Sequence, residues 1–270
     1  MPRRPGLASR AGPALAAAAA GAALALTLPK PGLCFLAWGS PAVLVWLARR
    51  AASPRAAAVP GFAFGAAFAA VALHWIYLTC LFAKVPVPAA LLAWGALAAA
   101  LGVNWALFAA AGRTLEGRLP EFALPWAWAL CWAALEHASL RWTPRLGADL
   151  LAYTQWRHPA LVQVGALAGP HLLGFVIMAV NAAWAGVAAA FAPGARVLRP
   201  ALAALLFSGA LACSCAAYGL FSLAGRARFL ASAHRGATAV VLQPNIDQYR
   251  KWDASFAGEI RAAFEALLER

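Results

Sequence analysis

Apolar residues dominate the chain up to position 221, and polar residues interrupt them only in short clusters. A helix that crosses a membrane needs ~20 mostly apolar residues. The apolar segments indicate about seven spans, of which the first two are short and form a hairpin that only just crosses. These spans cover residues 13–28, 33–47, 59–81, 87–111, 124–140, 161–191 and 200–221. The pattern therefore predicts a polytopic α-helical membrane domain over residues 1–221.

The pattern changes after Phe221. Residues 222–236 mix arginines with alanine and glycine, which favours a linker at the membrane surface. Residues 238–242 are β-branched and apolar, as is typical of a buried strand in a parallel sheet. Residues 253–270 then show helical spacing, with apolar side chains on one face. That face carries Phe256, Ile260, Phe264 and Leu267. Strand, loop and helix predict the start of an α/β domain over residues 237–270, which is incomplete because a sheet needs more strands.

The composition supports a membrane protein. Hydrophobic residues make up 64% of the chain and charged residues 11%, and the mean hydropathy is +0.72. A soluble domain cannot bury so much apolar surface. The net charge of +13 comes from basic residues in short loops, where they act as topology signals, and no basic stripe with interleaved aromatics favours nucleic acid. Loops on the side of the N-terminus carry more Lys and Arg than the others. We therefore expect a cytoplasmic N-terminus and a periplasmic segment after Phe221 in a bacterial inner membrane.

Few residues in the expected spans carry chemistry on their own. The five cysteines show no zinc-ligand spacing and no disulfide framework, so we interpret them as small buried hydrophobes and expect no metal or cofactor. Asn104 and Asn181 are expected to form hydrogen bonds between helices. Glu136 is expected either to pair with Arg141 or to lie near a lipid headgroup. His74 has no nucleophile near it in sequence and is a poor candidate for a general base.

The most specific pattern is a polar run after the expected strand. Gln243-Pro244-Asn245-Ile246-Asp247-Gln248, followed by Lys251-Trp252, resembles the Gln-x-Asn/Asp-Ile-x-Gln and Lys-Trp pattern of apolipoprotein N-acyltransferases. Three membrane segments resemble the same family in the same order. They are His74-Trp75-Ile76-Tyr77, Leu151-Ala152-Tyr153-Thr154-Gln155 and residues 169–181, which keep Gly174-Phe175 and Asn181. The chain departs from the family's Gly-Phe-Pro-Trp at residues 145–148 and from its Glu-x-x-Arg at Glu136.

The resemblance implies an inner-membrane enzyme of lipoprotein maturation. Such an enzyme has eight spans, and a periplasmic nitrilase-like αββα domain of the CN hydrolase type stands before the last. A Glu-Lys-Cys triad works there: the cysteine takes an acyl chain from a phospholipid, and the thioester then acylates the N-terminal amine of a diacylglyceryl-modified apolipoprotein. The resemblance implies substrate contacts for Trp252, Gln243, Asn245, Trp75, Tyr153 and Gln155.

The catalytic triad itself is expected beyond Arg270. The family's glutamate stands in a Trp-Pro-Glu motif, which residues 1–270 lack, and none of the five cysteines matches the nucleophile. We therefore expect these residues to be an N-terminal portion of such an enzyme and to transfer no acyl chain alone.

Two other classes of protein stay open at this point. A catalytically inactive, membrane-anchored relative or binding module would differ from the enzyme only in residues beyond Arg270. A transporter would show inverted repeats or paired broken helices, and the strand expected at residues 238–242 has no place in it.

Overall fold

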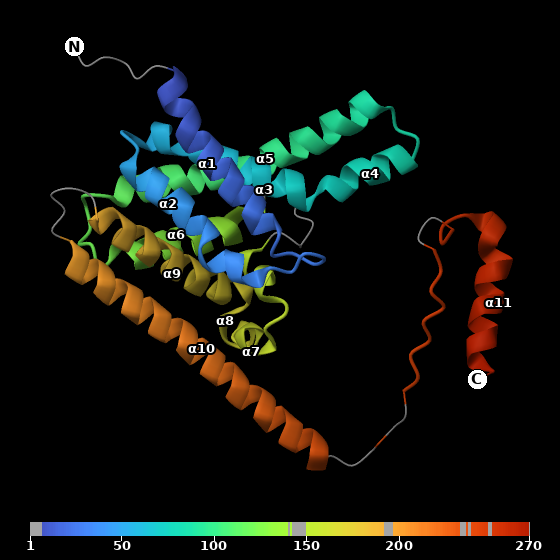
Figure 1. The fold of residues 1–270 in the computed structure, drawn as a ribbon. Helices are drawn as coiled ribbons and strands as arrows, with labels where there is room; N and C mark the ends of the chain where they lie inside the picture. The colour runs from blue at the N-terminus through green and yellow to red at the C-terminus, as the bar shows by residue number, and fades with distance from the viewer. Residues whose placement is uncertain are drawn as a thin grey trace. The chain divides into compact units, whose positions relative to one another are not determined.

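The computed structural model describes residues 7–139, 141, 150–191, 197–232, 236, 239–247 and 250–269. The chain divides into two compact units, Met1–Gly225 and Arg226–Arg270. The regular secondary structure of the described residues is helical (Figure 1).

The first unit is a helical assembly. In chain order its elements are α1 (Leu7–Ala25), η1 (Cys34–Trp38), α2 (Ser40–Arg50), α3 (Pro54–Ala72), α4 (His74–Phe82), α5 (Val87–Leu115), α6 (Leu124–Ser139), η2 (Leu151–Gln155), α7 (Pro159–Val162), α8 (Gly165–Ala168) and α9 (Pro170–Ala190). Helix α10 (Leu198–Ser232) begins in this unit and ends in the second. The second unit also contains η3 (Ala254–Phe256) and α11 (Ala257–Leu268).

Four of the described helices are long and apolar enough to cross a membrane: α3, α5, α9 and α10. About seven spans were expected, and local backbone geometry accounts for much of the difference. The expected third span leaves the helix at Leu73 and restarts as α4. The expected sixth span begins as α7 and α8, and Gly169, with a φ of 70°, precedes the proline that opens α9. The expected second span is divided between η1 and the 11 residues of α2.

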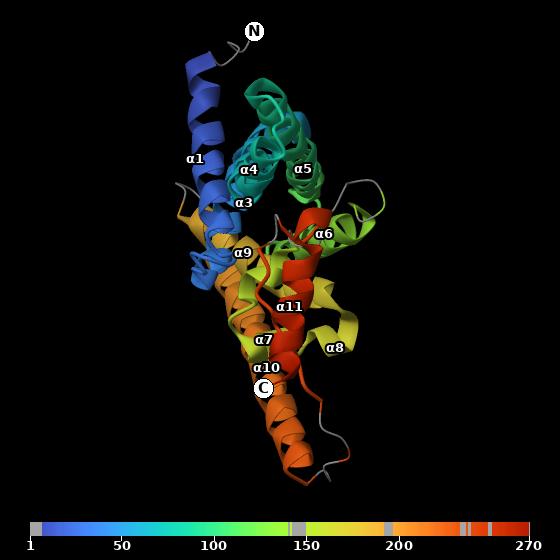
Figure 2. The same cartoon turned by 90° about the vertical axis from the view of Figure 1, so that its right-hand side faces the viewer.

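Close packing of small residues holds the first unit together. Helix α3 lies between α1 and α5 (Figure 2). A Cβ atom on Gly65 of α3 would lie 2.5 Å from Cδ1 of Trp105 on α5, so only glycine permits this approach. The Trp105 ring lies 4.6 Å from that of Phe64 and 4.1 Å from that of Trp132 on α6. Helix α9, buried over most of its length, packs against α2 and α6.

The second unit confirms the expected helix but contains no strand among its described residues. Helix α11 covers most of the expected helical segment, and the Asp253 side chain caps η3 before it. Residues 239–242, where a strand was expected, form neither helix nor strand, and Val241 is 90% exposed. Thr238 lies outside the described residues. A strand requires a partner for its backbone hydrogen bonds, and no described segment supplies one. The linker expected at 222–236 is helical as far as Ser232.

Candidate functional site

The short turn η2 lies against η1 and α9 and is fixed by a buried amide. Nε2 of Gln155 donates to the carbonyl oxygen of Cys34 at 3.0 Å and to Oγ1 of Thr154 at 3.1 Å. Oε1 of Gln155 accepts from Nε1 of Trp38 at 3.1 Å. The amide therefore has protein partners on both sides. In this geometry Gln155 ties η2 to η1 and holds its neighbours in place.

Tyr153 stands on the other side of the turn and is 42% exposed. It forms part of the wall of a cavity of about 400 Å³ between η2, α7, α8 and α9. The size falls in the range of small-molecule pockets, ~300–1,000 Å³. The cavity is mainly apolar and is lined by Ala152, Tyr153, Trp156, Val162, Gly165, Pro170 and Leu173. Such a wall suits a hydrocarbon chain. The indole nitrogen of Trp156 already donates to the carbonyl oxygen of Thr27 at 3.3 Å.

Glu136 of α6 connects this turn to α9. Its Oε1 accepts from the backbone nitrogen of Leu151 at 2.9 Å, and its Oε2 lies 3.0 Å from Nδ1 of His171. The carboxylate is buried, and a Cβ atom on Gly174 would lie 3.2 Å from Oε2. Arg141, one of the two partners considered for Glu136, is exposed, and the structure places the His171 ring at this carboxylate. Proximity in the sequence pointed to Arg141, whereas the fold brings α9 to Glu136.

The other four expected substrate contacts lie elsewhere. Trp75 is half exposed on α4 and does not line the cavity. In the second unit, Gln243 and Asn245 are exposed, and Asn245 has a φ of 54°. Trp252 is 81% exposed, with Nζ of Lys251 5.8 Å from its ring centroid. The structure therefore brings Tyr153 and Gln155 together on one turn, and it places Gln243, Asn245 and Trp252 in the other unit.

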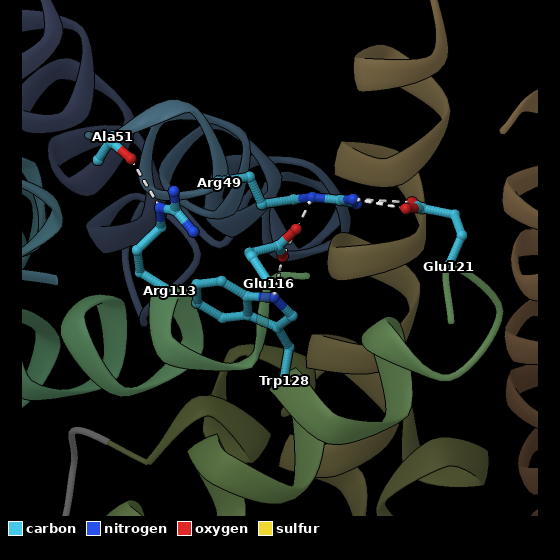
Figure 3. Close-up of polar contacts among 6 residues, drawn as sticks. All are labelled: Arg49, Ala51, Arg113, Glu116, Glu121 and Trp128. Atoms are coloured by element: carbon cyan, nitrogen blue, oxygen red, sulfur yellow. Dashed lines mark hydrogen bonds and ion pairs between the residues drawn. The ribbon is translucent and has the colours of Figure 1, made fainter. Parts of the chain in front are cut away.

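A second polar cluster joins α2, the end of α5 and the segment before α6 (Figure 3). Nη2 of Arg49 lies 2.8 Å from both carboxylate oxygens of Glu121, and its Nε lies 3.2 Å from Oε1 of Glu116. Nε1 of Trp128 donates to the same oxygen of Glu116 at 3.0 Å. Arg113 donates from Nε to the carbonyl oxygen of Ala51 at 2.6 Å. Sequence reasoning treated these arginines as topology signals, and nothing in the linear pattern marks Arg49 as buried.

Titratable groups give little indication of metal chemistry. Within the described residues, no three His, Cys, Asp or Glu side chains are grouped so as to hold a metal ion.

In the second unit, Ser255 donates to Oδ1 of Asp253 from its hydroxyl at 2.7 Å and from its backbone nitrogen at 2.9 Å. These hydrogen bonds lower the pKa of Asp253. Because Asp253 caps η3, the effect is local to that turn.

Comparison with known proteins agrees with the resemblance in the sequence. Residues 20–183 match the family model of the apolipoprotein N-acyltransferase N-terminal domain, a range that contains η2, Glu136 and the Arg49 cluster. The chain is also 31% identical over 257 residues to an apolipoprotein N-acyltransferase of Geobacter metallireducens. That alignment covers 94% of this chain and 47% of the relative, so the chain spans about half the length of the curated relative that it matches. The chain belongs to the apolipoprotein N-acyltransferase family and carries its N-terminal membrane domain.

Proposed function

We propose that this chain supplies the membrane-embedded part of an enzyme that transfers an acyl chain from a phospholipid to the N-terminal amine of a diacylglyceryl-modified apolipoprotein. The observation that carries the proposal is the apolar cavity beside Tyr153, on the turn that resembles the family's Leu-Gly-Tyr-Ser-Gln segment. Both substrates of such a reaction carry hydrocarbon chains. A cavity with apolar walls would hold one such chain in a fixed position, which the mobile chains of the bilayer do not have.

The proposed roles rest on where each residue lies. Tyr153 contacts the acyl chain or its ester directly, because it lines the cavity and is partly exposed. Gln155 has an indirect role: it holds the turn that bears Tyr153, because its amide is hydrogen-bonded to Trp38 and Cys34. Trp252, Gln243 and Asn245 would contact substrate from a periplasmic nitrilase-like domain that residues 237–270 begin. Trp75 would contact lipid from α4.

In this proposal the chemistry itself needs groups other than residues 1–270. The family's cysteine thiolate attacks the ester carbonyl of the phospholipid, with a glutamate as base and a lysine stabilising the oxyanion. The lysophospholipid leaves as an alcohol. The amine of the apolipoprotein then attacks the thioester, so that the amide C–N bond forms, the C–S bond breaks and the cysteine thiolate is released. We propose an inner-membrane location with a cytoplasmic N-terminus, and no acyl transfer by residues 1–270 alone.

A chimera tests the proposal. The chain would be joined to the second half of the Geobacter metallireducens relative and expressed in bacteria depleted of their own enzyme. Mass spectrometry of lipoprotein N-terminal peptides should show triacylated product with the chimera and only diacylated peptides with residues 1–270. A chimera that is present in the membrane with native-like protease resistance and leaves all peptides diacylated would refute the proposal.

A cavity-filling variant separates the proposed site from the rest of the membrane domain. Val162→Trp places a large ring in the cavity, whereas Leu167→Trp adds the same ring at a position of α8 that is 60% exposed and does not line it. We expect the first change to slow acylation by the chimera at least tenfold and the second to leave it within about twofold. Equal rates in the two variants would exclude the cavity as the acyl site.

A further inference from the structure

A second apolar hollow lies apart from the Tyr153 cavity, along η1, α2 and α9. It is an open groove of about 650 Å³. Three tryptophans stand along it, Trp38 and Trp46 on the η1 and α2 side and Trp184 on α9. Trp184, Phe35 and Val43 are exposed by 48%, 67% and 37%. Tryptophans are enriched in membrane proteins at the level of the lipid headgroups. In a membrane domain, exposed apolar side chains such as these are expected to face lipid.

Hydrogen bonds fix the floor of this groove. Trp38 is held by its hydrogen bond to Gln155. Asn181 of α9 donates from Nδ2 to the carbonyl oxygen of Ala37 at 2.8 Å and accepts at Oδ1 from the backbone nitrogen of Ala42 at 2.9 Å. These bonds lock η1 and the first turn of α2 onto α9. The groove is thus preformed, which lowers the cost of ordering a ligand in it.

A positive charge stands beside the groove, at the last residue of α2. Cζ of Arg50 lies 4.7 Å from the centroid of the Trp46 ring, so its guanidinium stacks on a groove-lining side chain. Arg50 is exposed and has no carboxylate partner in the described part of the chain. The neighbouring Arg49 is different, because Glu116 and Glu121 neutralise it. The groove therefore has beside it a guanidinium with no carboxylate partner among the described residues, a group suited to bidentate contact with phosphate.

We propose that this groove binds one anionic phospholipid, with a hydrocarbon chain along α2 and its phosphate on Arg50. Charge complementarity selects this occupant: the apolar floor takes the chain, and the cation stacked on Trp46 takes the negative headgroup. The site would hold a lipid that anchors α2 against α9, at a place different from the proposed acyl site beside Tyr153. It requires no catalysis and does not depend on the proposed function.

Native mass spectrometry of the purified chain from mixed micelles containing equal phosphatidylglycerol and phosphatidylcholine tests the site. The variants are Arg50→Gln, which removes the charge, and Val43→Trp, which fills the groove. Arg55→Gln is the matched control, an exposed arginine at the start of α3 that does not contact the groove. We expect the wild-type chain to retain one molecule of phosphatidylglycerol in preference to phosphatidylcholine. Arg50→Gln should reduce the retention of phosphatidylglycerol about fivefold, and Arg55→Gln should reduce it less than about twofold.

Three results would overturn the proposal. Equal retention of the two lipids by the wild-type chain would indicate annular lipid only. Equal retention of phosphatidylglycerol by wild type, Arg50→Gln and Arg55→Gln would remove Arg50 from the site. A dimer that disappears in Val43→Trp, with no bound lipid, would assign the groove to a second copy of the chain. The Arg50→Gln comparison decides the matter even if Val43→Trp fails to fold.

Discussion

The Arg49 cluster gives the sharpest test of how this membrane domain is held together (Figure 3). The side chain of Arg49 is 8% exposed, and those of Glu116 and Glu121 are 13% and 11% exposed. Arg49→Met keeps most of the volume and removes the charge. Glu121 then loses both of its 2.8 Å hydrogen bonds from Nη2. Glu116 keeps the hydrogen bond from Trp128, so Glu121 becomes the main uncompensated charge.

The magnitude depends on burial. Removing one partner of a buried ion pair costs about 3–5 kcal/mol, because the remaining charge stays desolvated. The three side chains keep a little solvent contact, so we reduce this figure and expect a loss of about 2–4 kcal/mol in the free energy of unfolding. Arg55→Met is the matched control, since Arg55 is exposed at the start of α3 and forms no ion pair with a described residue. This surface substitution should change the free energy of unfolding by under about 1 kcal/mol.

Unfolding of the purified chain in detergent micelles, followed by tryptophan fluorescence, provides the measurement. A double variant, Arg49→Met with Glu121→Gln, should recover part of the loss and show a coupling energy above about 1 kcal/mol. If Arg49→Met and Arg55→Met destabilise the chain equally, or if the coupling energy is zero, then the buried cluster does not stabilise the fold.

Other contacts support three further predictions. Glu136→Leu removes the acceptor of the Leu151 backbone nitrogen, so hydrogen exchange in η2 should rise and stability should fall by about 1–3 kcal/mol. Gly61→Ala places a Cβ atom 2.5 Å from a backbone oxygen of α5 and should cost about 1–3 kcal/mol in the same unfolding assay, whereas Gly95→Ala meets nothing within 4 Å and should not destabilise. Ser255→Ala should raise the pKa of Asp253 in an NMR titration. The stabilisation from that cap is complete above the ordinary carboxyl pKa and is lost as the pH falls through the lowered value.

Apolar length predicted the long helices and failed where the backbone interrupts an apolar run. The expected span at 87–111 begins with α5 at Val87, and α10 contains the whole of the expected span at 200–221. Leu73, where the helix breaks between α3 and α4, is itself apolar, and the one polar residue beside it, His74, does not lower the mean hydropathy of the run enough to mark the break. The same limit applies to residues 239–242, which have strand-like composition. Composition expresses a preference, but a strand forms only when another segment accepts its hydrogen bonds.

The sequence indicated that polar residues in the membrane domain would form hydrogen bonds, but it did not indicate which residues would be their partners. Asn181 was expected to hydrogen-bond between helices, and its bonds to Ala37 and Ala42 confirm this. The same reasoning could not place His171 on Glu136, 35 residues away, or Glu121 on Arg49, 72 residues away. A buried polar group must find a partner, but which partner it finds depends on how the helices pack.

Helix α9 links these contacts because it places a small or amide residue at each of them. Gly174 leaves room for the Glu136 carboxylate, which holds the turn bearing Tyr153. Asn181 fixes the floor of the apolar groove along η1, α2 and α9. Gly186 leaves room for the ion pair of Arg49, since a Cβ atom there would lie 3.0 Å from a carboxylate oxygen of Glu121. Larger side chains at Gly174 and Gly186 would force the buried charges from their partners. The sequence of α9 is therefore constrained by the polar groups of its neighbours more than by its own hydropathy.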